Sequence, residues 1–158
     1  MKPTFRYAER NDMPLIMKFV RDLARYEHLE DQVVATPEIM EHWIFDLKRA
    51  EVIFVLEEGK EVGFALFFHN FSTFLGRAGI YLEDLFVDPA CRGRGYGRAL
   101  MEKLASIAVE EGCGRFEWWV LNWNEPSIRF YKSLGAVPMS EWTVYRVTGD
   151  ALQKLAGK

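Results

Sequence analysis

The first part of the chain begins with a short strand-like segment, and its apolar residues then follow helical spacing. We expect a strand at residues 5–8 and, after a cap at Asn11-Asp12, a helix. A second helix is predicted to begin with Thr36 as N-cap and Pro37 in its first turn, because these residue types favour those positions. The apolar residues expected to face the core from the two helices are Leu15, Ile16, Phe19, Val20 and Leu23, and then Ile39, Met40, Trp43 and Leu47.

Beyond residue 50 the chain becomes rich in residues that favour strands. Residues 52–56 and 61–68 enclose the turn Glu58-Gly59, an arrangement typical of a β-hairpin. The further elements expected are a loop at 70–79, a strand at 80–87, a helix after residue 97 that buries Leu100, Leu104, Ile107 and Ala108, a strand at 116–121, a short helix at 126–134, a strand at 142–147 and one or two helical turns at 150–155. This order predicts an α/β fold with one mixed sheet flanked by helices, and the length favours a single domain over residues 1–158.

The composition excludes several classes of protein. Of the 158 residues, 49% are hydrophobic and 15% aromatic, and the formal net charge is −3, which fits a globular domain better than a disordered or fibrous chain. A slightly acidic balance argues against general binding of duplex nucleic acid. No apolar run approaches the roughly 18 residues of a membrane span. We therefore expect a cytoplasmic protein with no nucleic-acid partner and no membrane partner.

The cysteines and histidines show no metal-binding or redox spacing. Cys91 and Cys113 lie too far apart in sequence for a CxxC motif, and His28, His42 and His69 form no HExxH pair. We therefore expect reduced thiols and no metal.

A glycine-rich segment joins the strand at 80–87 to the helix that follows. The glycines at positions 93, 95 and 97 let the backbone approach a ligand closely, with N–H groups pointing outward at the start of a helix. Arg92, Arg94 and Arg98 add positive charge, so the loop predicts a pyrophosphate cradle. The loop lacks the Gly-Lys-Ser/Thr of a nucleotide triphosphatase, and Arg98 occupies the third glycine position of the dinucleotide fingerprint.

The loop and further segments resemble the GCN5-related N-acetyltransferases (GNAT). Residues 92–97, RGRGYG, are similar to the R/Q-x-x-G-x-G/A signature that holds the pyrophosphate of acetyl-CoA in that family. The segments similar to its diamine branch, the spermidine/spermine and thialysine acetyltransferases, are 23–27 (LARYE), 30–33 (EDQV), 81–87 (YLEDLFV) and 124–132 (NEPSIRFYK). The likeness spans nearly the whole chain, is weakest at 45–79 and after Ala136, and departs at Trp118-Trp119.

The resemblance implies a mostly antiparallel GNAT-type sheet with acetyl-CoA at the split between the two central strands, and it implies a homodimer. It also implies which residues hold acetyl-CoA. The backbone of Leu85, Phe86 and Val87 would bind the pantetheine arm like an added strand. The other residues expected to hold the coenzyme are Arg92, Gly93, Arg94, Gly95, Tyr96, Gly97 and Arg98 in the loop, and Asn124, Glu125, Pro126 and Ser127 at the later helix.

Two residues are predicted to move protons during the transfer. An alkyl amine titrates near 10.4, so a base is useful at neutral pH, and strand alternation places Glu83 on the face of Leu85 and Val87. Glu83 would act directly or through water, unless it only pairs with an arginine or is solvated. Its neighbour Asp84 faces the other way and is interpreted as structural. Tyr131 matches the proton donor of the family, as a hydrogen-bond donor to the thiolate or as an outright general acid.

The amine is expected to bind at an acidic end of the molecule. Between Arg21 and Glu51 there are eight acids and four bases, a field that attracts a polycation, although charged helix faces are often merely solvated. The substrate-binding residues expected here are Tyr26, Glu27, Glu83, Glu117, Trp118 and Trp119. The sequence thus predicts direct acetyl transfer to a small primary amine, either a polyamine or a thialysine- or lysine-like amine. The alternatives are a protein or peptide acetyltransferase and a non-catalytic acetyl-CoA sensor.

Overall fold

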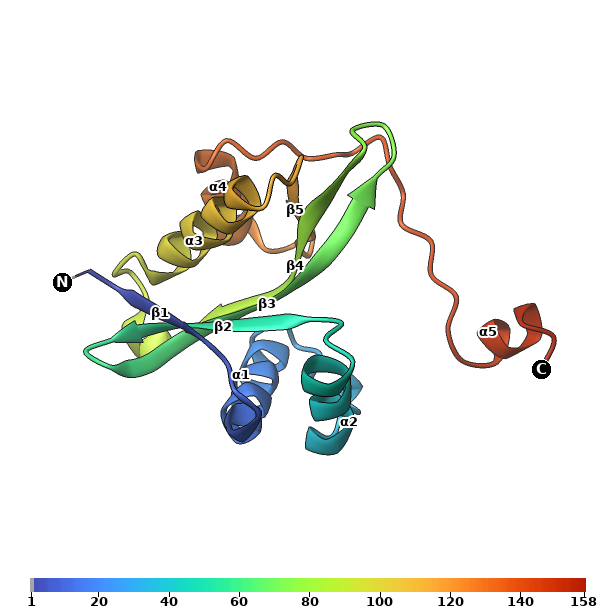
Figure 1. The fold of residues 1–158 in the computed structure, drawn as a ribbon, viewed down its shortest axis with the longest axis horizontal. Coiled ribbons are helices and arrows are strands. Elements are labelled where there is room, and N and C mark those ends of the chain that lie inside the picture. The colour runs from blue at the N-terminus through green and yellow to red at the C-terminus, as the bar shows by residue number, and fades with distance from the viewer. Residues whose placement is uncertain (1) are drawn as a thin grey trace. The chain divides into compact units, whose positions relative to one another are not determined.

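In the computed structural model, which describes residues 2–158, five strands form one sheet in the order in which they occur along the chain. The strands are β1 (Thr4–Tyr7), β2 (Glu51–Glu57), β3 (Lys60–Ser72), β4 (Arg77–Val87) and β5 (Phe116–Trp118). Neighbouring strands from β1 to β4 run antiparallel, whereas β5 pairs with β4 in parallel (Figure 1). The prediction of a mixed, mostly antiparallel sheet is therefore confirmed.

The chain divides into two compact units, Met1–Trp119 and Val120–Lys158. The first unit holds the sheet and the helices α1 (Met13–Tyr26), α2 (Pro37–Glu41) and α3 (Tyr96–Glu110), with short 3-10 turns at Arg10–Asp12, Glu30–Gln32 and Pro89–Cys91 and a π-helical turn at His42–Asp46. The second unit holds α4 (Glu125–Ser133) and α5 (Gly149–Leu155). None of the helices described is both long enough and apolar enough to cross a membrane.

Helices cover both faces of the sheet in the first unit (Figure 1). On one face, Phe19 of α1 stacks on Phe64 with 5.3 Å between ring centroids, and Phe54 and Phe86 complete the aromatic core. On the other face, α3 buries the four residues predicted for it, Leu100, Leu104, Ile107 and Ala108. Each large apolar side chain removed from water contributes roughly 1.5–3 kcal/mol, so the two layers hold the sheet rigid beneath any site at its edge.

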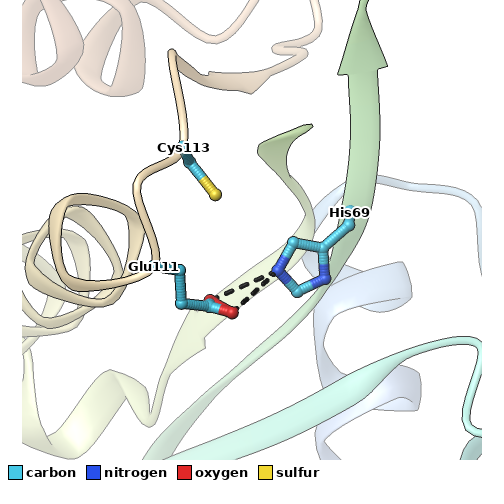
Figure 2. Close-up of side chains that lie close together, drawn as sticks. All are labelled: His69, Glu111 and Cys113. Atoms are coloured by element: carbon cyan, nitrogen blue, oxygen red, sulfur yellow. Dashed lines mark hydrogen bonds and ion pairs between the residues drawn. The ribbon is translucent and has the colours of Figure 1, made fainter. Parts of the chain in front are cut away.

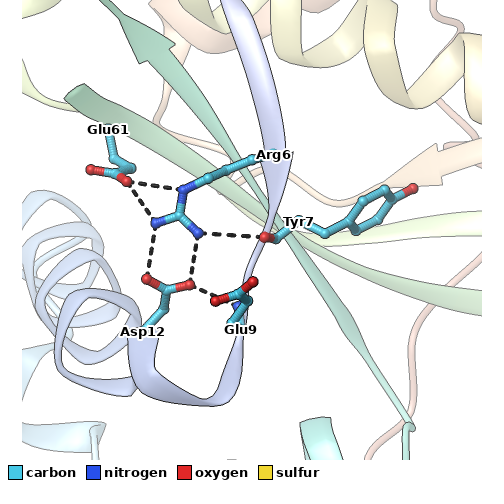
Figure 3. Close-up of polar contacts among 5 residues, drawn as sticks. All are labelled: Arg6, Tyr7, Glu9, Asp12 and Glu61. Carbon is cyan, nitrogen blue, oxygen red and sulfur yellow. Dashed lines mark hydrogen bonds and ion pairs between the residues drawn. The ribbon is translucent and has the colours of Figure 1, made fainter. Parts of the chain in front are cut away.

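An arginine fastens β1 to the start of α1 and to β3 (Figure 3). The guanidinium of Arg6 donates two hydrogen bonds to the carboxylate of Asp12, at 2.8 and 2.9 Å, and two to Glu61, at 3.0 and 2.6 Å. It also lies over the ring of Phe54, 4.9 Å from the centroid. Because Arg6 is hydrogen-bonded to both acids, it lowers the pKa of Asp12 and of Glu61.

The helix predicted from Thr36 begins as expected but buries a different face. The Thr36 hydroxyl accepts a hydrogen bond from the Ile39 amide at 3.2 Å. The helix then widens into the π-helical turn at His42–Asp46, whose extra residue rotates the following side chains so that Ile44 enters the core. The residues predicted to be buried and found exposed are Ile39, Trp43 and Leu47.

Several predicted strands differ from those in the structure. The hairpin strands β3 and β4 extend to Ser72 and back to Arg77, so the loop expected at 70–79 is reduced to its central residues. The strand predicted at 116–121 ends at Trp118. The strand predicted at 142–147 is wrong, because within the part of the chain that the structure describes these residues pair with no other strand. A strand needs a neighbouring strand for its backbone hydrogen bonds, and a strand-like sequence does not by itself provide that neighbour.

Candidate active site

β4 is irregular at its two adjacent acids. Leu66 of β3 lies opposite Asp84, whereas the next residue, Phe67, lies opposite Leu82, so Glu83 has no residue opposite it on β3. This is a β-bulge, a feature that re-aims side chains and is common beside active sites. Strict alternation therefore does not apply across Glu83, so counting along the strand does not fix whether this residue shares the face of Leu85.

The predicted split between β4 and β5 begins at the same place. The parallel pairing ends where Leu82 lies opposite Trp118, yet β4 continues to Val87. From Glu83 onward, no strand among the described residues lies along this edge of β4. Its backbone N–H and C=O groups can therefore bind an extended ligand as an additional strand would.

Three carboxyl groups gather at the bulge. Glu27 follows the last residue of α1, and Glu83 and Asp84 come from β4. Burial, together with the charges of Glu83 and Glu27, raises the pKa of Asp84 to about 7. Burial and the charge of Glu83 also raise the pKa of Glu27. These acids have lost part of their hydration and repel one another. A bound ammonium group would offset both effects, so the group attracts a cation.

Asp84 is the residue of this group that sequence reasoning interpreted differently. It lies opposite Leu66, on the sheet face of the α1 core, and close enough to Glu83 and Glu27 for their charges to affect it. The signal available in sequence was the adjacent pair of acids within an apolar strand. The bulge that turns both acids to the same group is set by pairing with β3, which the sequence of one strand does not show.

Arg92 reaches back from the start of the glycine loop to the ends of α1 and β4. Its guanidinium lies 5.0 Å from the ring centroid of Tyr26 and 5.0 Å from that of Phe86. Its Nε donates a hydrogen bond to the carbonyl oxygen of Val87 at 3.0 Å. Arg92 therefore joins the end of α1, the end of β4 and the loop, and it holds Tyr26 next to Glu27.

The glycine loop has the backbone shape of an anion cradle. Gly93 and Gly95 have φ angles of +79° and +86°, and Gly95 is the N-cap of α3. An added Cβ at either position would meet no heavy atom within 4 Å, so the space on the ligand side is open. Glycine adopts such φ values without strain, which explains the glycines at positions 93 and 95.

The side chains of the loop are engaged within the protein. Arg94 forms an ion pair with Glu57 at 2.8 Å, and the hydroxyl of Tyr96 donates a hydrogen bond to the same carboxylate at 2.6 Å. This contact raises the pKa of Tyr96 to about 12. Arg98 pairs with Glu102 at 2.8 Å. The loop therefore presents its backbone amides and the N-terminus of α3 to an anion, and its arginines fix its shape.

The aromatic residues predicted for the amine fall near the split. The ring of Trp119 stands edge-on to Tyr81, with 5.7 Å between centroids, and Tyr81 packs against Phe68 at 5.0 Å. Trp118 packs against Phe116 at 4.8 Å. Glu117 accepts a hydrogen bond from Asn70 at 3.1 Å and forms an ion pair with Arg115 at 2.9 Å, so its charge is already compensated.

In the second unit, the residues predicted to hold coenzyme and to donate a proton lie on α4 and its cap. Asn124 is buried, and its Oδ1 accepts a hydrogen bond from the Ser127 amide at 3.4 Å. This cap fixes the start of the helix, with Glu125 and Pro126 in the first turn. Tyr131 is half-buried, and its ring lies 5.5 Å from that of Phe130.

Solved structures share this arrangement of strands and helices. A Vibrio cholerae integron cassette protein superimposes with a TM-score of 0.82 and 30% identity, covering 100% of this chain and 99% of that one. An aminoglycoside acetyltransferase from a soil metagenome superimposes with a TM-score of 0.78 at 17% identity, covering 94% and 97% of the two chains. These matches show that the chain shares its α/β fold with both proteins.

The sequence comparisons identify the family. Residues 16–136 match the Acetyltransferase (GNAT) family. The chain is 37% identical to thialysine N-epsilon-acetyltransferase of Sus scrofa, covering 97% of this chain and 96% of that protein. It is 31% identical to L-ornithine N5-acetyltransferase of Arabidopsis thaliana, covering 95% and 86%. The chain belongs to the GNAT family of acetyltransferases, enzymes that use acetyl-CoA as co-substrate.

Proposed function

We propose that this enzyme acetylates a primary amine of a small molecule that carries a further cationic group, either a polyamine or a thialysine- or lysine-like amine. The observation that carries the proposal is the group of Glu27, Glu83 and Asp84 at the bulge, beside the open edge of β4. A second ammonium group bound to these acids would hold the reacting amine in place. The relatives named for thialysine and for ornithine support the same class of substrate.

The residues present fit acetyl-CoA. The glycine loop 93–97 and the N-terminus of α3 suit its pyrophosphate, and the edge of β4 at 85–87 suits its pantetheine arm. Arg92, Arg94 and Arg98 would support the loop, and the first turn of α4, from Asn124 to Ser127, would complete the site. The bound coenzyme supplies the thioester whose acetyl group is transferred.

Acids at the bulge and a tyrosine would move the protons of the reaction. The attacking amine must lose a proton, and a carboxyl group whose pKa is near 7 accepts it more readily than an ordinary carboxylate does. Glu83 would take this proton, directly or through water, and Asp84, whose pKa is about 7, would be a second acceptor at the bulge. The hydroxyl of Tyr131 would donate a proton to the sulfur atom as the C–S bond breaks. The aromatic rings of Tyr26, Trp118 and Trp119 would contact the ammonium groups.

The test is release of free thiol from acetyl-CoA by the purified full chain. The panel is spermidine, spermine, putrescine, thialysine, lysine, ornithine and a basic peptide. We expect turnover with one or more of the small amines. Turnover should fall strongly in Glu83→Gln but not in Glu38→Gln, which changes an exposed acid of α2. Turnover with the peptide alone would favour a protein acetyltransferase. Binding of acetyl-CoA without turnover on any amine would favour the sensor.

The same proposal extends to assembly and location. Residues 1–158 would act as one domain, because the family match runs across the boundary between the two units. A homodimer would cover exposed aromatic side chains such as Trp142 and Tyr145, which are 76% and 92% exposed. Both cysteines are free thiols, which suits the reducing cytoplasm. The charge of −3 supports a small-molecule partner rather than nucleic acid.

A further inference from the structure

A histidine, a glutamate and a cysteine converge at the far end of α3, outside the residues assigned above to acetyl transfer. His69 belongs to β3, Glu111 caps the C-terminus of α3, and Cys113 lies in the connection to β5. Figure 2 shows the Glu111 carboxylate directed at the His69 ring and the Cys113 thiol directed into the same space. One donor atom from each residue lies within 4.8 Å of the other two.

The spacing of these donor atoms suits a tetrahedral metal ion. Zinc bonds of about 2.0–2.3 Å place neighbouring ligand atoms of a tetrahedron roughly 3.3–3.8 Å apart. Nε2 of His69 lies 3.2 Å from both carboxylate oxygens of Glu111, close to that value. The thiol needs to approach by about 1 Å at most, which rotation of the Cys113 side chain can supply.

The surroundings provide negative charge and access. Glu51 lies opposite Phe67 in the sheet and therefore shares the sheet face of His69 two residues further along β3. Its charge interacts with both His69 and Glu111, so it is the next anionic donor at this end of the sheet. A cavity of about 740 Å³, lined in part by Tyr7 and Glu51, borders the group at His69.

We propose that His69, Glu111 and Cys113 form a binding site for a divalent transition-metal ion of the zinc type, with Glu51 or water as the fourth ligand. Imidazole, thiolate and carboxylate together favour Zn²⁺ or Co²⁺ over Mg²⁺ or Ca²⁺, which prefer oxygen ligands. On binding, a metal–sulfur bond replaces the S–H bond of Cys113, and the thiol proton passes to solvent. The ion would tie β3 to the connection that leads into β5, the strand that borders the split.

The metal itself is the probe that tests this site. Co²⁺ is titrated into the metal-free full chain, and the thiolate-to-cobalt absorption band in the near ultraviolet is followed, with Zn²⁺ then added to displace it. We expect one Co²⁺ per chain with a thiolate band. The band should be lost in Cys113→Ser and retained in Cys91→Ser, which removes the other cysteine. Zn²⁺ affinity should fall at least 10-fold in His69→Gln and in Glu111→Gln, but not in His42→Gln.

The outcomes separate this site from adventitious binding and from acetyl transfer. The proposal would be overturned if no thiolate band formed, or if the band were lost in Cys91→Ser and retained in Cys113→Ser. Thermal unfolding of each variant in the presence of chelator shows whether that variant is folded. If Cys113→Ser does not fold, Glu111→Gln still tests the site, because this substitution is at an exposed position. In the wild type, Zn²⁺ should raise the unfolding temperature, and this shift should vanish in all three ligand variants.

Discussion

Asp84 is half-buried beside Glu83 and Glu27, and this position should make the protein less stable at alkaline pH. Its folded-state pKa, about 7, lies above the ordinary value of 3.8, so the folded state holds the proton more tightly than the unfolded state. The resulting cost is fully present above pH 7 and is relieved as the pH falls toward 4, with a slope of up to about 1.4 kcal/mol per pH unit.

We therefore predict that Asp84→Asn is more stable than the wild type at pH 8 and that the difference shrinks as the pH falls toward 4. Urea unfolding at several pH values measures this directly. Asp31→Asn, at an exposed acid, is the matched control and should show no such trend. Equal stability of Asp84→Asn and wild type at pH 8 would mean that ionised Asp84 costs the folded protein nothing.

Tyr131 can be tested separately from binding. Tyr131→Phe keeps the ring and its packing against Phe130 and removes only the hydroxyl, so acetyl-CoA affinity should stay within about threefold. The turnover number should fall by about 100-fold, the usual contribution of a positioned proton donor. Steady-state kinetics and calorimetric titration of the coenzyme give the two quantities. Unchanged turnover would remove Tyr131 from the mechanism.

For single residues, the sequence indicated which acids belong to the site but not that they lie close together. Glu83 and Glu27 were identified from a strand that carries acids and from a family resemblance. Asp84 was assigned to the opposite side because alternation assumes an unbroken strand, and the bulge at Glu83 breaks it. His69 and Glu111 lie 42 residues apart, so no local motif brings them together.

Among the elements, the junction of the glycine loop with α3 provides a matched pair of substitutions. Gly95 has a φ of +86° in open space, so Gly95→Ala introduces backbone strain without a clash and should cost about 1–2 kcal/mol. Gly97 lies inside α3, and an added Cβ would approach only Val87, at 4.0 Å. Gly97→Ala should be neutral or stabilising by up to about 1 kcal/mol. Urea unfolding checks both, and a larger loss in Gly97→Ala than in Gly95→Ala contradicts this account.

Elements with a neighbour to pair with were predicted well. β2 and the start of β3 followed from the β-rich segments on both sides of Glu58-Gly59, and α1 and α3 followed from apolar spacing that the core confirms. Residues 142–147 have the composition of a strand but no partner in the described chain. The π-helical turn at 42–46 also depends on how Ile44 meets the core, which local spacing does not encode.

On the scale of the whole molecule, an acidic binding group should make substrate binding depend on pH and salt. Burial and mutual repulsion raise the pKa of Asp84 to about 7, so this acid carries more negative charge at pH 8 than at pH 6. A diamine that stays doubly charged across this range should therefore bind more tightly at pH 8. Added salt should weaken binding at either pH, because it screens these charges.

Thermal shift measurements with putrescine test this prediction. At 100 times its dissociation constant, a ligand adds about 2.7 kcal/mol of stability, which corresponds to a rise of several degrees for a chain of this size. We expect the rise to be larger at pH 8 than at pH 6, to be small with the monoamine butylamine, and to be lost in Glu83→Gln but kept in Glu38→Gln. Equal shifts for the monoamine and the diamine would show that the acids do not recognise a second ammonium group. In that case, aromatic contacts at Tyr26 and Trp119 would have to provide the binding of the amine.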